Sequence, residues 1–156
     1  MTRWEMAEAY RKKSFNCAQC VLLSFGDLTG LTEETAKAIA GGLGGGFGGC
    51  KEEACGALSG AVLVLGLLMP HTQDDDLDAK RRVYGAAAEF RRRFAERFGC
   101  TRCGGLLSLE PKPEDLQLAE RLGSRRICAA FIVETVMLLE AYLKELRLIN
   151  DMRTGE

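Results

Sequence analysis

A glycine-rich segment at residues 41–49 interrupts an otherwise helical pattern, and it limits the folds open to this chain. The segment reads GGLGGGFGG and holds seven of the chain's 18 glycines. Each glycine costs a helix roughly 1 kcal/mol relative to alanine, so the segment forms a loop or a distorted helix end. Few stretches of the chain alternate apolar and polar residues with a period of two, and only three prolines occur. The sequence therefore predicts an all-α fold with a glycine-rich loop before its central helix.

Helical periodicity continues on both sides of this loop. The expected helices cover residues 1–13, 15–28, 32–40, 52–68, 77–98, 114–122 and 124–148, with a loop at 100–105. Ser14 is the expected cap of the second helix, and residues 52–68 are apolar on most faces, which is typical of a central helix. We expect a single compact redox domain over residues 1–156, built from five to seven helices.

The overall composition favours a soluble protein. Hydrophobic residues make up 47% of the chain, enough to bury a core without disulfides. The net charge of −1 and the scattered basic residues argue against a nucleic-acid partner. The longest apolar run, residues 57–69, is too short for a bilayer of roughly 30 Å, so no membrane insertion is expected. The first residues lack a secretory signal pattern, and we expect a cytoplasmic location.

The chain is rich in sulfur and poor in imidazole, with a single histidine. Its seven cysteines are Cys17, Cys20, Cys50, Cys55, Cys100, Cys103 and Cys128. Cytoplasmic cysteines stay reduced, and an odd number cannot all pair, so metal binding or catalysis is favoured over a disulfide framework. Thiolates bind iron, zinc and copper and exchange electrons.

The spacing of the cysteines narrows the choice of metal group. Between the two CxxC pairs, at 17–20 and 100–103, lie 79 residues, whereas zinc motifs usually separate such pairs by roughly 15–20 residues. Neither pair continues as CxxCH, and no βαβ pattern supports a thioredoxin-like site. An iron–sulfur cluster requires only that four thiolates meet in space. We also expect Cys55 and Cys128 to ionise most readily, because both are predicted near helix starts and Cys128 follows the cations Arg125 and Arg126.

Several segments together resemble a known family. They are Phe15-Asn16-Cys17-Ala18-Gln19, the CGALSG sequence at 55–60, the FGCTRC sequence at 98–103, and Cys128. They are similar to the C_GCAxxG_C_C family of putative redox-active proteins, over roughly residues 15–143. This family is related to the iron–sulfur domain of split-Soret cytochromes. The resemblance implies a ligand set of Cys17, Cys55, Cys103 and Cys128.

The remaining cysteines and several glycines gain candidate roles from that resemblance. Cys20, Cys50 and Cys100 are additions to the family pattern and could be further ligands or redox thiols. Glycine lets backbone N–H groups approach sulfur closely, so Gly48, Gly49 and Gly56 are candidates for supporting the ligands. Packing of helices against one another is an equally good reason for these glycines.

The sequence favours an iron–sulfur protein for electron transfer or redox sensing, with an unidentified redox partner protein. One alternative is a metal-free thiol–disulfide oxidoreductase, with Cys55 as nucleophile and Cys17 or Cys50 as resolving thiol. Others are a structural zinc or copper site and a helical interaction module with buried cysteines. No catalytic machinery is recognisable beyond the cysteines. A homodimer could form through helix 77–98 and the last helix.

Overall fold

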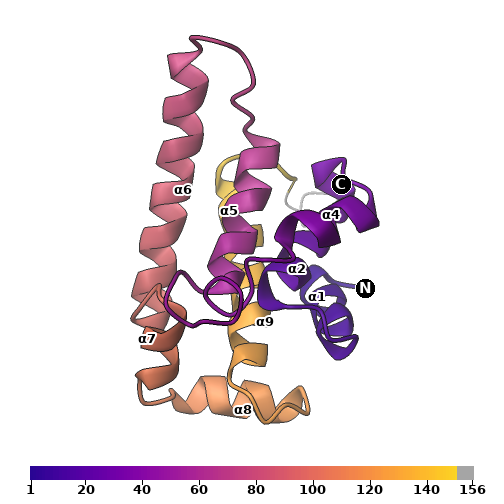
Figure 1. Cartoon of the computed structure of the whole chain (residues 1–156), viewed down its shortest axis with the longest axis vertical. Helices are drawn as coiled ribbons and strands as arrows, with labels where there is room; N and C mark the ends of the chain where they lie inside the picture. Colours follow the sequence, from indigo (N-terminus) through magenta and orange to yellow (C-terminus); the bar gives the residue numbers. More distant parts are fainter. Residues whose placement is uncertain (151–156) are drawn as a thin grey trace.

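The computed structural model describes residues 1–150, and within them the chain forms nine α-helices (Figure 1). Their bounds are α1 Arg3–Lys12, α2 Cys17–Leu23, α3 Gly26–Thr29, α4 Glu33–Ala40, α5 Gly56–Leu68, α6 Leu77–Phe98, α7 Cys103–Ser108, α8 Pro113–Arg121 and α9 Cys128–Glu145. The all-α prediction is confirmed, but five to seven helices was too few. The last six residues of the expected domain, 151–156, lie outside the described residues.

One of the two additional helices comes from a break that the periodicity did not indicate. The expected helix 15–28 is divided into α2 and α3 near Phe25, which is fully buried. Ser14 was the wrong cap. It adopts a left-handed φ of +69°, and Asn16 caps α2 instead.

Helix α5 runs through the middle of the molecule between α2, α6 and α9 (Figure 1). Its contact with α2 depends on the absence of a side chain at Gly60. A Cβ atom there would lie 2.7 Å from the carbonyl oxygen of Ala18. The two backbones therefore approach closely, and α2 is held directly against the central helix.

The long helix α6 contributes aromatic rings to the core beside α9. Phe90 and Phe94 are fully buried, and the ring of Phe98 lies 5.2 Å from that of Phe131 on α9. The buried carboxylate of Asp115, on α8, accepts a hydrogen bond of 2.8 Å from Arg97 of α6. These contacts fix the end of the bundle at which α7 and α8 lie (Figure 1).

The glycine-rich loop folds back on itself and then pairs with the segment before α7. The N–H of Cys55 donates to Thr101 O at 2.8 Å, and that of Cys103 donates to Glu53 O at 2.8 Å. On one side, this antiparallel bridge uses residues 53–55, which the sequence had predicted to be helical, and on the other it uses residues 101–103 of the expected loop. As a result α5 begins at Gly56 rather than at 52, and α7 begins inside the expected loop 100–105.

None of the helices within residues 1–150 has both the length and the apolar character needed to cross a membrane.

Candidate functional site

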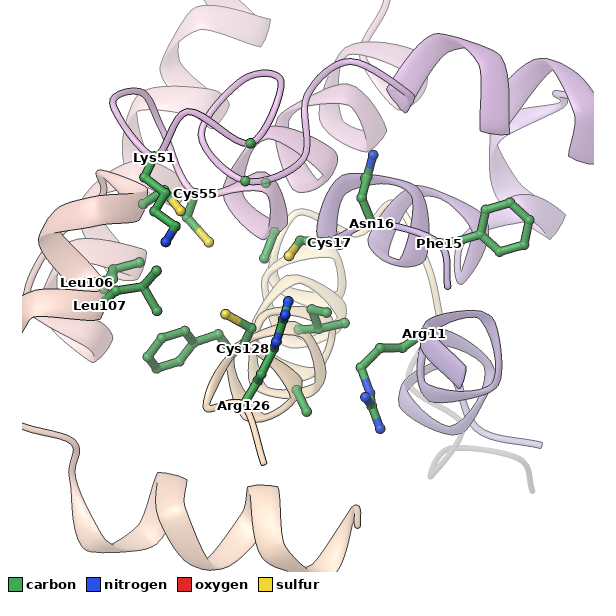
Figure 2. A pocket seen from close by; sticks show the side chains of 18 of the residues that line it. Arg11, Phe15, Asn16, Cys17, Lys51, Cys55, Leu106, Leu107, Arg126 and Cys128 are labelled. Carbon is green, nitrogen blue, oxygen red and sulfur yellow. The ribbon is translucent and has the colours of Figure 1, made fainter. Parts of the chain in front are cut away.

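Four of the seven cysteines stand where helices begin. Cys17, Cys103 and Cys128 are the first residues of α2, α7 and α9, and Cys55 is the N-cap residue of α5. All four line one cavity of about 590 Å³. Figure 2 shows the sulfur atoms of Cys17, Cys55 and Cys128 directed toward this cavity from different sides. Thiols that are up to 111 residues apart in sequence (128 − 17) are thus brought to one place.

The position of Cys17 is fixed by a capping box around the start of α2. The side chain of Asn16 accepts a hydrogen bond from Gln19 N, and Gln19 Oε1 accepts one from Asn16 N, both at 2.9 Å. Asn16 Nδ2 also donates to Gly41 O at 3.0 Å, which joins α2 to the end of α4. Gly44 packs against this cap, since a Cβ there would lie 2.4 Å from Asn16 Cβ.

Glycines then bring the other cysteines close to the loop and to α2. A Cβ at Gly46, whose φ is +70°, would lie 2.8 Å from Cys103 Cβ. A Cβ at Gly56 would lie 2.9 Å from Cys17 Cβ. Side chains at these two positions would displace the cysteines, so the glycines define how closely the thiols gather.

Burial dominates the electrostatics of the four cavity thiols. It raises the pKa of Cys17 far above its ordinary value and the pKa of Cys55 to about 11. Burial also raises the pKa of Cys103 and of Cys128, and neighbouring thiols raise the pKa of Cys17 further. The expectation that Cys55 and Cys128 ionise most readily was wrong. Both do lie at helix starts, but the cost of removing a thiolate from water outweighs the field of the helix.

Two cations oppose this effect from the edge of the cavity. Lys51 lowers the pKa of Cys103 and Cys128, and Arg126 lowers that of Cys128, although burial remains the larger influence. Lys51 lies in the loop before α5, and Arg126 lies two residues before α9. The sequence analysis noted Arg126 as a cation beside Cys128, but it did not single out Lys51. A cation next to a cysteine in sequence was the available signal, and it is a weak one.

The other three cysteines do not line this cavity. Cys20 is fully buried, and its thiol donates to Phe15 O at 3.5 Å. Cys50 is exposed, and its thiol donates to Gly46 O at 2.9 Å. Cys100 is partly exposed and packs so closely on Gly105 that a Cβ there would lie 2.4 Å from its Sγ. All seven cysteines are free thiols.

The candidate supporting glycines also separate into two groups. Gly49 and Gly56 line the cavity, whereas Gly48 does not and has no atoms near the position its Cβ would take. Gly46, which contacts Cys103, was not among the candidates. Its place in a run of glycines was compatible with many roles. Only the folded loop shows that Gly46 contacts Cys103.

The spread of the thiols limits what the cavity can hold without rearranging. Among residues 1–150, no group of three or more His, Cys, Asp or Glu side chains is arranged to hold a single metal ion. The four cysteines instead line a cavity of about 590 Å³. The cavity suits a metal group larger than one ion. A single ion would require the cysteine side chains to rotate inward.

Comparison with known proteins gives one match. Residues 15–142 match the family described as "Putative redox-active protein (C_GCAxxG_C_C)". No curated protein and no solved structure matches the chain.

Proposed function

Because the chain belongs to the C_GCAxxG_C_C family of putative redox-active proteins, we propose that it binds an iron–sulfur cluster for electron transfer or redox sensing. The ligands in this proposal are Cys17, Cys55, Cys103 and Cys128. The observation that carries it is the meeting of these four thiols, from four helix starts, at one cavity.

The chemistry of the cavity fits such a cluster. Four cysteine thiolates are the usual ligand set of iron–sulfur clusters, and soft sulfur ligands favour them. No histidine, aspartate or glutamate lines the cavity, so the cysteine sulfurs are the only side chains of the lining that bind metals strongly. When bound, a cluster supplies a centre that accepts and donates an electron.

The spacing of the thiols favours a cluster over a structural zinc ion. Tetrahedral zinc requires four sulfurs at about 2.3 Å from one point. The described residues hold no such single-ion group, and the thiols surround a cavity of about 590 Å³. A cluster separates its ligands more widely than one ion does, because its metal atoms are joined through sulfide.

The protonation of the thiols argues against a metal-free thiol–disulfide oxidoreductase. Such a protein needs a nucleophilic cysteine with a lowered pKa. Burial instead raises the pKa of Cys55, the nucleophile of that alternative, to about 11. Metal binding accommodates this state, because a thiol gives up its proton to the solvent when it becomes a ligand.

The surrounding residues would stabilise the deprotonated thiols. The backbone N–H groups of Ala57 and Leu58, in the first turn of α5, act to lower the pKa of Cys55. Lys51 and Arg126 act in the same direction on Cys128, while Phe131 and Leu106 form an apolar wall. Hydrogen bonds and positive charge near ligand sulfur also raise the reduction potential of a cluster, and the apolar wall limits access of water.

Anaerobic reconstitution with iron and sulfide tests this proposal. We expect a brown protein with visible absorption, bound iron and acid-labile sulfide. When zinc or copper is added to parallel samples, less metal should remain bound to the protein after gel filtration than in the iron sample. A colourless, iron-free protein after anaerobic reconstitution would refute the cluster. Retention of zinc alone would favour the structural metal site in its place.

A further inference from the structure

The cavity beside the thiols carries positive charge that no acidic residue of its lining balances. Arg11, Lys51 and Arg126 line it, and no aspartate or glutamate does. The chain as a whole has a net charge of −1, so this concentration of cations is not a general property of its surface.

Two of these cations have no ion-pair partner among residues 1–150. Arg11 is paired with the buried carboxylate of Glu8 on its own helix. Lys51 and Arg126 form no ion pair within the described part of the chain, and both are exposed. Figure 2 shows their charged ends on the cavity side, with the sulfurs of Cys55 and Cys128 nearby. They are therefore available to an anion at the opening.

One wall of the cavity is apolar and is formed by residues of α7 and α9. Leu106, Leu107 and Phe131 line the cavity there, and Figure 2 shows the two leucines facing Cys128 and Arg126 across it. Leu107 is 41% exposed, whereas Leu106 and Phe131 are buried, so this apolar wall meets solvent at Leu107. A pocket with an apolar wall and a few charged groups is typical of small-molecule sites, which have volumes of about 300–1,000 Å³.

We propose that this cavity binds a small organic anion, with its carboxylate between Lys51 and Arg126 and its apolar body against Leu106, Leu107 and Phe131. The inference rests on the proposed function in one respect: if a cluster is bound, the anion lies next to it. The binding itself depends on the cavity and its charges. Compensation of thiolate charge explains the two cations, but it does not explain an apolar wall beside them that meets solvent at Leu107.

Calorimetric titration with matched pairs of probes tests the inference. The probes are butanoate, hexanoate and phenylacetate, each compared with its uncharged amide, and inorganic phosphate as an anion with no apolar body. They are added to the iron-loaded protein without oxygen and to the metal-free protein. We expect at least one carboxylate to bind about tenfold or more tightly than its amide, which lacks the charge-assisted hydrogen bonds, and than phosphate, which lacks the apolar body.

Two variants and two controls connect the binding to this cavity. Lys51→Gln and Arg126→Gln should each weaken carboxylate binding about tenfold, and added salt should weaken it in the wild type. Arg125→Gln and Lys12→Gln remove exposed charges that do not line the cavity, and they should leave the affinity unchanged. Circular dichroism would establish that all four variants are folded.

The outcomes separate this inference from the proposed function. Equal affinity for each acid and its amide, or equal binding by Lys51→Gln, Arg126→Gln and wild type, would overturn the inference. It is also overturned if no carboxylate binds and the two variants change only iron loading, since the cations then serve the thiolates alone. If the chain takes up no iron but binds carboxylates with the expected dependence on Lys51 and Arg126, the cluster fails and the anion site stands.

Discussion

Cys17 and Cys20 lie one turn apart on α2, yet they face different surroundings. Cys17 lines the cavity at the start of the helix, while Cys20 is fully enclosed and its thiol donates to Phe15 O. The second CxxC pair divides in the same way, because Cys103 lines the cavity and Cys100 does not. In both pairs the cavity thiol is the first residue of a helix. The CxxC spacing therefore does not decide which thiols line the cavity. The cavity is lined by one thiol from each of four helix starts.

The largest expected effect is the loss of the iron centre from single cavity variants. Cys17→Ser, Cys55→Ser, Cys103→Ser or Cys128→Ser each removes a ligand, so we expect most of the iron and the visible absorption to be lost after reconstitution. Iron and sulfide analysis measures this directly.

The matched controls are the three cysteines outside the cavity. Cys20→Ala, Cys50→Ser and Cys100→Ser should retain the iron content and spectrum of the wild type. If Cys20→Ala lost the chromophore while Cys17→Ser kept it, the division of α2 into a cavity thiol and a core thiol would be wrong.

The next effect concerns the close contact that holds α2 against α5. Gly60→Ala places a Cβ 2.7 Å from Ala18 O, so we expect it to reduce the free energy of unfolding by about 1–3 kcal/mol and to lower iron loading. Gly66→Ala on the same helix has open space and should stabilise the protein by up to about 1 kcal/mol. Urea denaturation distinguishes the pair. Equal effects at the two positions would mean that α2 does not depend on this contact.

The pH dependence of stability should distinguish cavity thiols from the core thiol. The pKa of Cys55 rises from 9.0 to about 11 on folding. Below pH 9 this thiol is neutral in both states and contributes nothing. Between pH 9 and pH 11 only the unfolded chain ionises, so the metal-free protein should lose stability as pH rises, on the order of 2 kcal/mol from this thiol by pH 11.

Iron loading should remove this alkaline effect for the cavity thiols, because ligand thiolates are already deprotonated in the folded protein. The alkaline loss of stability should persist after loading for Cys20, because burial raises the pKa of this thiol to about 12. Anaerobic urea titrations at several pH values compare the loaded protein, the metal-free protein and the Cys55→Ala variant. An unchanged alkaline slope after loading would indicate that Cys55 is not a ligand.

The smallest expected effect is the loss of the cap that places Cys17. Asn16→Ala removes the side-chain acceptor for Gln19 N and the donor to Gly41 O. We expect a loss of about 1 kcal/mol in the free energy of unfolding, with weaker iron retention. Ser14→Ala is the control, since Ser14 makes no cap of α2. Equal destabilisation by the two variants would contradict the role assigned to Asn16.

Local patterns predicted those parts of the fold that depend on neighbours in sequence. Helix α6 was predicted with its observed bounds, because its apolar period is regular and Asp76 and Gly99 mark its ends. The start of α5 was misplaced because residues 52–55 pair with a segment almost 50 residues later. No local preference encodes that pairing.

The candidate site shows the same limit. The family resemblance indicated the four cysteines, but α5 and α9 begin at Gly56 and Cys128, each four residues after the expected starts at 52 and 124. The raised pKa of Cys55 could not be predicted, because burial comes from α2, α7 and α9 closing around it. Lys51 was missed for a related reason, since only the folded loop brings it beside Cys103.

The most direct test of the account is a crystal structure of the iron-loaded protein, grown without oxygen, with anomalous scattering measured at the iron edge. We predict iron density inside the cavity, bonded to the Sγ atoms of Cys17, Cys55, Cys103 and Cys128. Iron held instead at Cys50 or Cys100, or a loaded protein whose four cavity thiols carry no metal, would contradict it.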